Sequence, residues 1–552
     1  MPLALVAGVD VGNATTEVVL ASVATGEPVA ADRTMTRGVK GSPSSVRGAA
    51  ALVRRLVRRT SGSLVLVAVA PLRPVRTSSA TVPEPPPDTG RFAVVAAGVA
   101  SPGGAGFGAG RPVWLADVPV HGPPVVALVP VGYREAVPRL RELLLAGAPI
   151  AAVLLAADEA RLISNRLDAP VPVVDGVDLS AVATAPLVAV EVAPSGRPLR
   201  RLTDPLSLAG TLAAAASDSL ALRRVARRLA DVSSAVVAAF PAAAPSSSAP
   251  SSLIWTPSGA LPPAEAARAL ADGSLDAVSR YSLDGGEPVD VDDLAVVDVG
   301  ALASSLLVRA GAGESGFVLA GLLPSGGEVP ASALLEEALG VPVVGVGSEA
   351  SAAHAGALTT PGAPADSLVL DLGGGTVDVV GWSGERVLAG GGDLLTAAVA
   401  LGLGVTRGVA EWAKRGPAVR VETPQLAVQE DGDKTFLASP QPAGTVGWLA
   451  APGPAGLLPI TVRIGPAEWR AFRLALKQAV LGTAVRRGMA GAGTGTVVVV
   501  GGPAGDDEVL RVVDAVLPDG IGLGRGDVAG GLGHRYAVAW GLALSALEAQ
   551  RS

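Results

Sequence analysis

The stretch VAGVDVGNATTEVVLA, residues 6–21, predicts two strands joined by a tight turn. Gly12 can adopt a positive φ, and Asn13 tolerates one better than most residues do. The turn then gathers backbone N–H groups and the hydroxyls of Thr15 and Thr16 around a small concavity, which suits an anion. An ordinary β-hairpin whose polar tip faces water explains the stretch equally well when it is taken alone.

Two further stretches make the anion-binding interpretation stronger. LDLGGGTVDVV, residues 370–380, repeats the order of strand, Asp-x-Gly, small or hydroxyl residues, and strand. Two such hairpins in two halves of a chain can hold a polyphosphate from both sides, with Asp10 and Asp371 holding Mg²⁺ through water. In VVVVGGPAGDDEV, residues 497–509, a strand leads into glycines at the start of a helix, which suits the sugar or α-phosphate of a nucleotide.

The composition excludes several classes of protein. A chain of 552 residues, 49% apolar and 17% charged, is globular and long enough for about three domains. The net charge of −7, without a long basic block, argues against nucleic acid as a partner. The absence of cysteine excludes disulfides, thiolate metal sites and a cysteine nucleophile. Proline and glycine break every long uncharged stretch and no signal sequence precedes the first strand, so we expect a cytoplasmic protein without membrane contact.

The three glycine-rich turns, in this order and at this spacing, resemble those of the actin/Hsp70/sugar-kinase ATPase superfamily. Residues 6–21 match its first phosphate loop, 370–380 its second, and 497–505 its adenosine motif. SEASAAHAGAL, residues 348–358, resembles its connecting helix, and Glu349 falls where Hsp70-like proteins keep a glutamate near the attacking water. An acid that favours the macrodipole of a helix N-terminus is the alternative for Glu349.

This resemblance implies a fold and a set of site residues. The fold is α/β, a two-lobed actin/Hsp70-like (ribonuclease H-like) ATPase. The ligands are ATP or ADP with Mg²⁺. The catalytic residues carried over are Asp10, Glu349 and Asp371. The nucleotide-binding residues are Gly12, Asn13, Ala14, Thr15, Gly373, Gly374, Gly375, Thr376, Gly501, Gly502, Pro503 and Ala504.

Other segments narrow the resemblance. They are SPGGAGFGAG (101–110), RLISNRLDAPVPVVDGV (161–177), GALTTPG (356–362) and AGGGDLLTAAVA (389–400). They resemble the large subunit of the reactivating factor for adenosylcobalamin-dependent diol and glycerol dehydratases, and the resemblance extends from residue 7 to about residue 544. It implies a chaperone-like ATPase that pairs with a small subunit, as two large and two small subunits. The complex binds a dehydratase that holds a damaged cobalamin and releases that cofactor with the help of ATP.

The same family resemblance implies the domain organisation. An ATPase domain takes residues 1–85, 251–412 and 467–552, a swivelling domain takes 86–250, and a small β-rich insert takes 413–466. The sequence departs from the family pattern at Ala14, where a hydroxyl is more usual, and at Pro503, which lacks an N–H donor.

A second metal site is also implied by the resemblance. Its hydroxyl ligand falls on Ser101, where the family usually has threonine, and its carboxylates fall on Asp158 and Asp175. Such hard oxygen ligands suit Mg²⁺ or Ca²⁺. Without the resemblance, Asp158 would be a helix-capping acid and Asp175 a turn residue.

Alternatives remain for the function and for one lysine. A small-molecule kinase of the same superfamily would need a base near the γ-phosphate, for which Asp378 is the candidate. A scaffold protein that does not hydrolyse ATP is the third class, and the presence of Asp10, Glu349 and Asp371 argues against it. Lys477 could contact adenine or ribose, or could be an ordinary solvated helix lysine.

Overall fold

The structure is a computed structural model, and it consists of two compact units. It describes residues 3–81, 89–98, 102–167, 169–194, 197–230, 232–241, 252–275, 277–283, 286–307, 316–324, 331–381, 384–491 and 495–551. The first unit comprises Met1–Pro83 and Pro250–Ser552, and the second comprises Glu84–Ala249. The second unit is therefore inserted in the sequence of the first.

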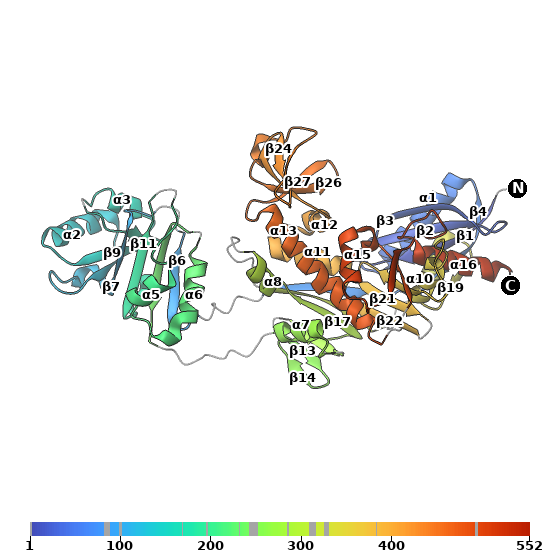
Figure 1. The fold of residues 1–552 in the computed structure, drawn as a ribbon, viewed down its shortest axis with the longest axis horizontal. Coiled ribbons are helices and arrows are strands. Elements are labelled where there is room, and N and C mark those ends of the chain that lie inside the picture. Colours follow the sequence, from blue (N-terminus) through green and yellow to red (C-terminus); the bar gives the residue numbers. More distant parts are fainter. Residues whose placement is uncertain are drawn as a thin grey trace. The chain divides into compact units, whose positions relative to one another are not determined.

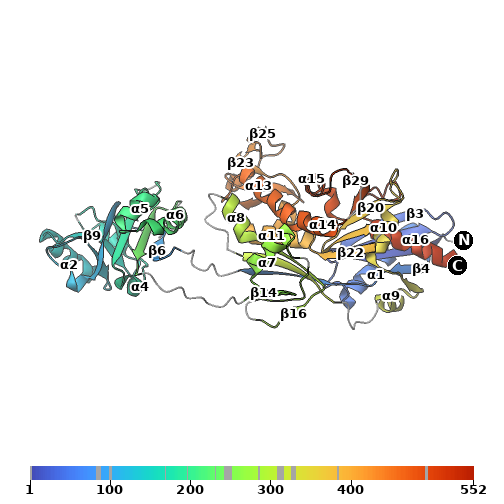
Figure 2. The same ribbon diagram turned by 60° about the horizontal axis from the view of Figure 1, so that its bottom comes forward.

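Two five-stranded sheets of the first unit repeat one topology (Figures 1 and 2). In each, a hairpin is followed by a strand that returns parallel to the first strand of the hairpin. One sheet has the order β19-β4-β1-β2-β3, with strands Val343–Gly345, Ser63–Val69, Ala4–Val11, Thr15–Ser22 and Pro28–Met35. The other has the order β29-β28-β20-β21-β22, with strands Gly522–Arg525, Thr496–Val500, Leu368–Leu372, Thr376–Gly381 and Gly384–Ala389. The predicted two-fold repeat is thus visible in the strand order.

Three further sheets complete the described part of the first unit. Their orders are β17-β18-β5 (Asp293–Asp298, Gly316–Leu322, Val75–Thr81), β14-β13-β15-β16 (Gly259–Leu261, Leu253–Thr256, Arg280–Ser282, Val289–Asp290) and β25-β24-β23-β26-β27 (Lys434–Phe436, Leu426–Val428, Val419–Thr423, Leu449–Gly453, Gly456–Thr461). The last contains a hairpin of β24 and β25 with its turn at residues 430–433.

The helices of the first unit cover the faces of these sheets. They are α1 Pro43–Thr60, α7 Pro263–Asp272, α8 Val299–Leu306, α9 Ala331–Leu339, α10 Glu349–Ala357, α11 Gly392–Leu403, α12 Arg407–Ala413, α13 Pro466–Lys477, α14 Thr483–Gly488, α15 Asp507–Asp514 and α16 Ala537–Arg551. A π turn at Gln478–Gly482 lies between α13 and α14 and joins them directly.

The second unit is a seven-stranded mixed sheet with helices. Its order is β10-β9-β8-β7-β11-β12-β6, with strands Val173–Val174, Ile150–Leu155, Val125–Val129, Gly106–Trp114, Leu187–Val192, Ser234–Ala239 and Phe92–Ala97. Its helices are α2 Tyr133–Leu145, α3 Ala160–Ser164, α4 Leu179–Ala183, α5 Pro205–Thr211 and α6 Ser219–Arg228. Apolar clusters lie on both faces of the sheet, so this unit has a core of its own.

In the described part of the chain, no single helix is long and apolar enough to cross a membrane. The bent pair α11 and α12 passes that test by length and composition alone, and most of α11 is buried in the core of the first unit.

Glycines bring β1, α10 and α16 into direct backbone contact, and Figures 1 and 2 show the two helices side by side. A Cβ atom on Gly8 would lie 1.9 Å from the carbonyl oxygen of Ala539, and one on Gly541 would lie 1.9 Å from that of Ala352. A Cβ atom on Gly356 would lie 2.0 Å from the oxygen of Ala537. Since β1 ends at the first predicted phosphate loop and α10 begins at Glu349, this packing fixes their relative positions.

Adding one methyl group at this crossing tests its tightness. We expect Gly541→Ala to lower the free energy of unfolding by about 1–3 kcal/mol, because the backbone of α10 must move to make room. Gly408→Ala on α12 is the matched control, because the added methyl group would meet no atom nearer than 4.0 Å and alanine restricts the unfolded chain. That control should be neutral or stabilising by up to about 1 kcal/mol. Urea unfolding measures both, and an equal effect of the two variants would contradict the tight crossing.

Candidate functional site

The two predicted phosphate loops form the same turn. The backbone N–H of Gly12 donates to the carbonyl oxygen of Thr15 at 2.9 Å, and that of Gly373 donates to Thr376 at 2.9 Å. In both, the hydrogen bond closes the hairpin at the end of a strand that carries an aspartate, Asp10 or Asp371. The sequence repeat therefore corresponds to a repeat of local geometry.

The loops also contact each other. A Cβ atom on Gly375 would lie 1.7 Å from Nδ2 of Asn13, and one on Gly374 would lie 3.0 Å from Cβ of Ala14. No larger side chain fits at Gly375 without displacing the first loop. A hydrogen bond helps to fix the side chain of Asn13, because its Oδ1 accepts the N–H of Val75 at 3.5 Å.

The third turn, Gly501–Gly505, lies against the second loop. Gly501 has φ +89°, and a Cβ atom there would lie 2.4 Å from Oδ1 of Asp371. Its N–H donates to the carbonyl oxygen of His534 at 2.8 Å. The helix does not begin at these glycines as expected, because the 3₁₀ turn Pro503–Gly505 intervenes and α15 begins at Asp507. The structure nevertheless brings all three turns together.

Acidic side chains face one another beneath the turns. Asp10 pairs across the hairpin with Glu17, and Asp371 pairs in the same way with Asp378. Glu17 and Asp378 are buried, while Asp10 and Asp371 keep part of their surface exposed. Glu349, at the first position of α10, is close enough to affect the pKa of three of these acids. The predicted catalytic residues therefore lie together, with Glu17 as an acid that the sequence did not single out.

Lys40 is a member of the site that the sequence analysis missed. Its Nζ donates to Oε2 of Glu349 at 2.6 Å, and the side chain is buried. Burial lowers the pKa of Lys40, but the charge and hydrogen bond of Glu349 raise it more, so the pKa is raised and the lysine is charged. Two signals pointed to it: Lys40 is one of four lysines in the chain, and it lies between Gly38 and Gly41, whose φ angles are +71° and +86°.

The site carries excess negative charge. Burial and then Glu17 and Glu349 raise the pKa of Asp10 well above its usual value. Burial, followed by the nearby Glu349 and Glu17, raises the pKa of Asp371 to about 7. Lys40 is the cation that opposes these shifts.

Two buried carboxylate oxygens have no hydrogen-bond partner among the described residues. They are Oε1 of Glu349 and Oδ1 of Asp378. Unpaired hard oxygen atoms beside Asp10 and Asp371 are the donors that Mg²⁺ and its bound water prefer, so the residues present fit this ion. In the described part of the chain, no group of three or more His, Asp or Glu side chains is arranged to coordinate a metal directly.

The predicted second metal site is described in part. Ser101 lies outside the described residues. The carboxyls of Asp158 and Asp175 lie within hydrogen-bonding reach of each other, and burial together with Asp158 raises the pKa of Asp175. Oδ2 of Asp175 accepts the N–H of Ala160 at 2.9 Å. The alternative that Asp158 caps a helix is therefore wrong, because Asp175 bonds the first residue of α3.

Lys477 is neither solvated nor free. Its Nζ bonds Oδ2 of Asp506 at 2.5 Å and Oε2 of Glu508 at 2.6 Å, and its side chain is 0% exposed. Arg473, one turn earlier and also fully buried, joins Glu430 and Glu508 at 2.6 and 2.7 Å. The alternative of a solvated lysine is wrong, and these ion pairs connect α13 to α15 and to the hairpin turn of the small β sheet.

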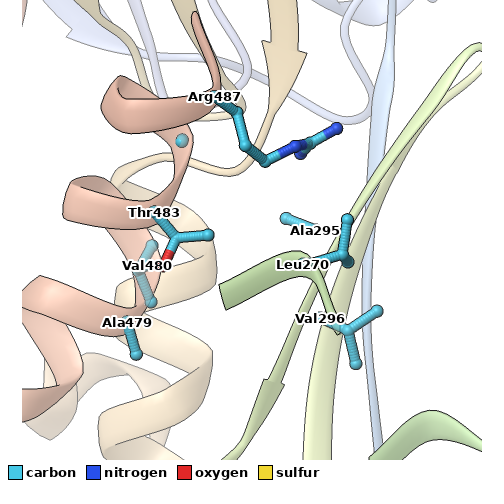
Figure 3. Close-up of a pocket in the computed structure, with 8 residues that line it drawn as sticks. Leu270, Ala295, Val296, Ala479, Val480, Thr483 and Arg487 are labelled. Atoms are coloured by element: carbon cyan, nitrogen blue, oxygen red, sulfur yellow. The ribbon is translucent and has the colours of Figure 1, made fainter. Parts of the chain in front are cut away.

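A small pocket elsewhere in the first unit contains none of the predicted site residues (Figure 3). It lies between α7, β17 and the π turn, and its lining is mostly apolar: Leu270, Ala295, Val296, Ala479, Val480, Thr483, Ala484 and Arg487. The one charged member is engaged, because Nη2 of Arg487 bonds Asp293 at 2.5 Å. The pocket is therefore a packing defect beside the π turn rather than a part of the site.

The raised pKa of Asp371 predicts a dependence of stability on pH. The folded chain without metal or nucleotide holds this proton more tightly than the unfolded chain, so stability falls as pH rises from about 4 to about 7 and stays low above it. Asp371→Asn removes the ionisation. We expect it to raise the melting temperature of the EDTA-treated protein at about pH 8, by an amount worth a few kcal/mol, by about half as much at about pH 5.5, and hardly at all near pH 4.

The control for this comparison is Asp519→Asn, which changes the same charge at an exposed position. It should shift the melting temperature little at any of these pH values. A gain from Asp371→Asn that is equal at all of them would contradict the raised pKa.

Two sequence profiles of known families match the chain. One is described as the diol dehydratase reactivase ATPase-like domain and matches residues 288–546. The other is described as the DD-reactivating factor swiveling domain and matches residues 93–244.

Curated relatives and solved structures extend over nearly the whole chain. The diol dehydratase-reactivating factor large subunit of Klebsiella michiganensis is 29% identical, and the match covers 98% of each chain. The propanediol dehydratase-reactivating factor large subunit of Salmonella typhimurium is 28% identical with the same coverage. The nucleotide-free diol dehydratase-reactivating factor superposes with a TM-score of 0.68 at 25% identity, covering 99% of this chain and 100% of that one. A glycerol dehydratase reactivase gives 0.70 at 26% identity with the same coverage.

These matches confirm the predicted α/β fold, with its ATPase-like domain and inserted swivelling domain. Both profiles describe domains of diol dehydratase reactivating factors. The match to the swivelling domain precedes the match to the ATPase-like domain, and together they span most of the chain. The full-length relatives carry the corresponding name. The chain thus carries matches to both domains of the diol dehydratase reactivases and is similar over nearly its whole length to their large subunits.

Proposed function

We propose that this chain is the ATP-hydrolysing large subunit of a factor that reactivates an adenosylcobalamin-dependent diol or glycerol dehydratase by releasing damaged cobalamin. Its relatives are named as large subunits of such factors, which supports a small subunit as partner and a dehydratase as client. Two large and two small subunits are the proposed assembly.

The observation that carries the proposal is the meeting of three glycine turns above a set of buried acids in one compact unit. The backbone N–H groups of the turns are placed to contact a polyphosphate, and Asp10 and Asp371 would hold Mg²⁺ through water. Bound Mg²⁺ supplies charge neutralisation at the phosphate oxygens. The carboxylates Asp10 and Asp371 have raised pKa values without a cation, which supports a role as cation-holding groups.

Glu349 is proposed to orient the attacking water and to accept its proton. Lys40 holds Oε2 of Glu349 at 2.6 Å, so the carboxylate cannot rotate freely, and Oε1 is left as the free proton acceptor. The Ser348 side chain caps α10 by accepting the N–H of Ser351 at 2.9 Å, which fixes the helix end that carries Glu349. Hydrolysis then alters the contacts of α10 with the phosphate loops.

The nucleotide state is proposed to change the affinity for the dehydratase, which is a coupling free energy between two sites. The ATPase domain would take residues 1–85, 251–412 and 467–552, the swivelling domain 86–250 and the β insert 413–466. Pro503 supplies no N–H at the third turn, and its Cγ lies 3.6 Å from the Cβ position of Gly392 at the start of α11. We expect it to contribute shape rather than a hydrogen bond there.

Glu349→Gln tests the proposed chemistry. We expect ATP hydrolysis to fall by about 10²–10³-fold, since a general base contributes on this scale, while ATP affinity changes by less than about threefold. The purified chain, a candidate small subunit and a cyanocobalamin-inactivated diol dehydratase are mixed with adenosylcobalamin and Mg·ATP. Dehydratase activity should recover with the wild-type chain and fail to recover with the variant.

Glu337→Gln on the exposed face of α9 is the matched control, and it should hydrolyse ATP and reactivate normally. Normal ATP hydrolysis by Glu349→Gln would contradict the role of this residue. Normal hydrolysis by the wild-type chain without recovery of the dehydratase would indicate another client, or a kinase whose substrate is a small polyol.

Ser101, Asp158 and Asp175 are proposed to bind Mg²⁺ or Ca²⁺ in the swivelling domain. The facing carboxyls of Asp158 and Asp175 support this proposal, because a divalent cation would relieve their repulsion. Calorimetric titration of Ca²⁺ into the nucleotide-free chain should show one class of sites that Asp158→Asn weakens by at least about tenfold. Asp117→Asn, an exposed carboxylate of the same unit, should leave the titration unchanged. Identical titrations of the two variants would contradict the site.

A further inference from the structure

Arg535 is fixed against the third glycine turn by the segment that carries it. The N–H of Gly501 donates to the carbonyl oxygen of His534 at 2.8 Å, and Nδ1 of His534 lies 2.7 Å from the carbonyl oxygen of Gly501. This reciprocal pair joins the two segments. A Cβ atom on Gly502 would lie 3.1 Å from Nη1 of Arg535, and one on Gly505 would lie 3.9 Å from Nη2. The guanidinium group therefore lies along the turn, at the distance of a contact.

Arg33 approaches the same region from the first sheet. Asp10, Glu17 and Arg33 are direct neighbours across β1, β2 and β3, so their side chains share one face of the sheet. Burial raises the pKa of Glu17, and the nearby charges of Arg33 and Arg535 oppose this rise. The row of neighbouring residues Asp10, Glu17 and Arg33 thus leads across the sheet from the proposed catalytic aspartate to an arginine. The second arginine, Arg535, comes from the segment at the third turn.

Neither arginine has a carboxylate partner of its own. In the described residues, the side chains of Arg33 and Arg535 form no ion pair within 4 Å and no side-chain hydrogen bond. The groups that face Arg535 are Arg33, Glu17, Arg415 and Tyr536, and burial followed by Arg33 lowers its pKa. Arg415 is engaged with Glu411 at 2.9 Å. Arg535 is half-buried and Arg33 is exposed, and two like charges that lack matching acids are a typical arrangement for an anionic ligand.

We propose that Arg535, assisted by Arg33, binds the phosphate chain of the nucleotide along the Gly501–Gly505 turn, and that it makes the site selective for nucleotides over nucleosides. This inference rests on the proposed nucleotide-dependent function. The planar fork of the guanidinium group matches two phosphate oxygens, which a lysine or an amide does not. Since the turn contributes no side chain beyond Pro503 and Ala504, Arg535 supplies the charge that its backbone lacks.

The test compares ligands that differ only in their phosphates. The affinities of the full chain for ATP, ADP, AMP, adenosine and inorganic phosphate are measured by titration calorimetry in the presence of Mg²⁺. Arg535→Gln should weaken the binding of ATP and ADP by about 10- to 100-fold, the effect of losing a hydrogen bond to a charged group, and that of adenosine by less than twofold. Arg33→Gln should weaken ATP and ADP by a smaller factor, about three- to tenfold.

Arg511→Gln is the matched control, because it removes the same charge from an exposed position on α15, after the same turn. It should change no affinity by more than about twofold. Arg535→Lys keeps the charge without the fork, and we expect an affinity between those of the wild type and Arg535→Gln. Unchanged adenosine binding and an unchanged melting temperature show that the variants are folded.

Three outcomes would overturn the inference. Equal weakening of adenosine and ATP would show that Arg535 positions the turn and does not contact phosphate. Unchanged ATP affinity in Arg535→Gln would exclude the contact. Loss of inorganic phosphate binding with normal ATP affinity would assign the arginines to a free anion. If the wild-type chain binds no nucleotide at all, the proposed function fails as well, so the two failures are distinguishable.

Discussion

The backbone contact among β1, α10 and α16 is the constraint on which the site depends. Three glycines allow it: Gly8 on the strand, and Gly356 and Gly541 on the helices, each meeting a carbonyl oxygen at about 2 Å from where a Cβ would be. Elements that touch through backbone cannot slide without breaking contacts along their whole length. Asp10 at the end of β1 and Glu349 at the start of α10 are therefore placed by one rigid joint. The loop after α10 belongs to it too, because Oγ1 of Thr359 accepts the N–H of Ala529 in the segment that leads to α16.

The rigid joint holds together charges that repel one another. Burial raises the pKa of Asp10, Glu17, Asp371 and Asp378, so the folded chain bears these acids at a cost in stability. Lys40 compensates part of the charge, and it reaches the site on a loop bounded by two left-handed glycines. An arrangement that costs free energy in the empty protein favours binding of a cation and recovers that energy when the cation arrives. The same acids would thus couple the stability of the fold to the proposed binding of metal and nucleotide.

Local patterns in the sequence predicted the parts of the site that the backbone forms. The strand–Asp-x-Gly–strand repeat predicted both hairpin turns, because turn geometry depends on residues that are adjacent in the chain, and the structure adds the same 2.9 Å hydrogen bond in each. Side chains that arrive from a distance were not predictable in this way. Lys40 meets Glu349 across 309 positions, and Arg535 reaches the turn through His534. The sequence around Lys477 does not distinguish a buried lysine from a solvated one. Its burial is evident only in the structure, where it forms ion pairs with Asp506 and Glu508.

These distant contacts also determine how the third turn can respond to its ligand. On one side it is joined to His534 and hence to α16, and on the other the Asp506 and Glu508 carboxylates that follow it are bonded to Lys477 and Arg473 of α13. Arg473 in turn bonds Glu430 in the hairpin turn of the small β sheet. Removing one partner of a buried ion pair costs about 3–5 kcal/mol. In these pairs the cations are fully buried and the carboxylates are 9–17% exposed, so the pairs hold the turn firmly in place. These contacts therefore connect the Gly501–Gly505 turn to the small β sheet on one side and to the segment that leads into α16 on the other.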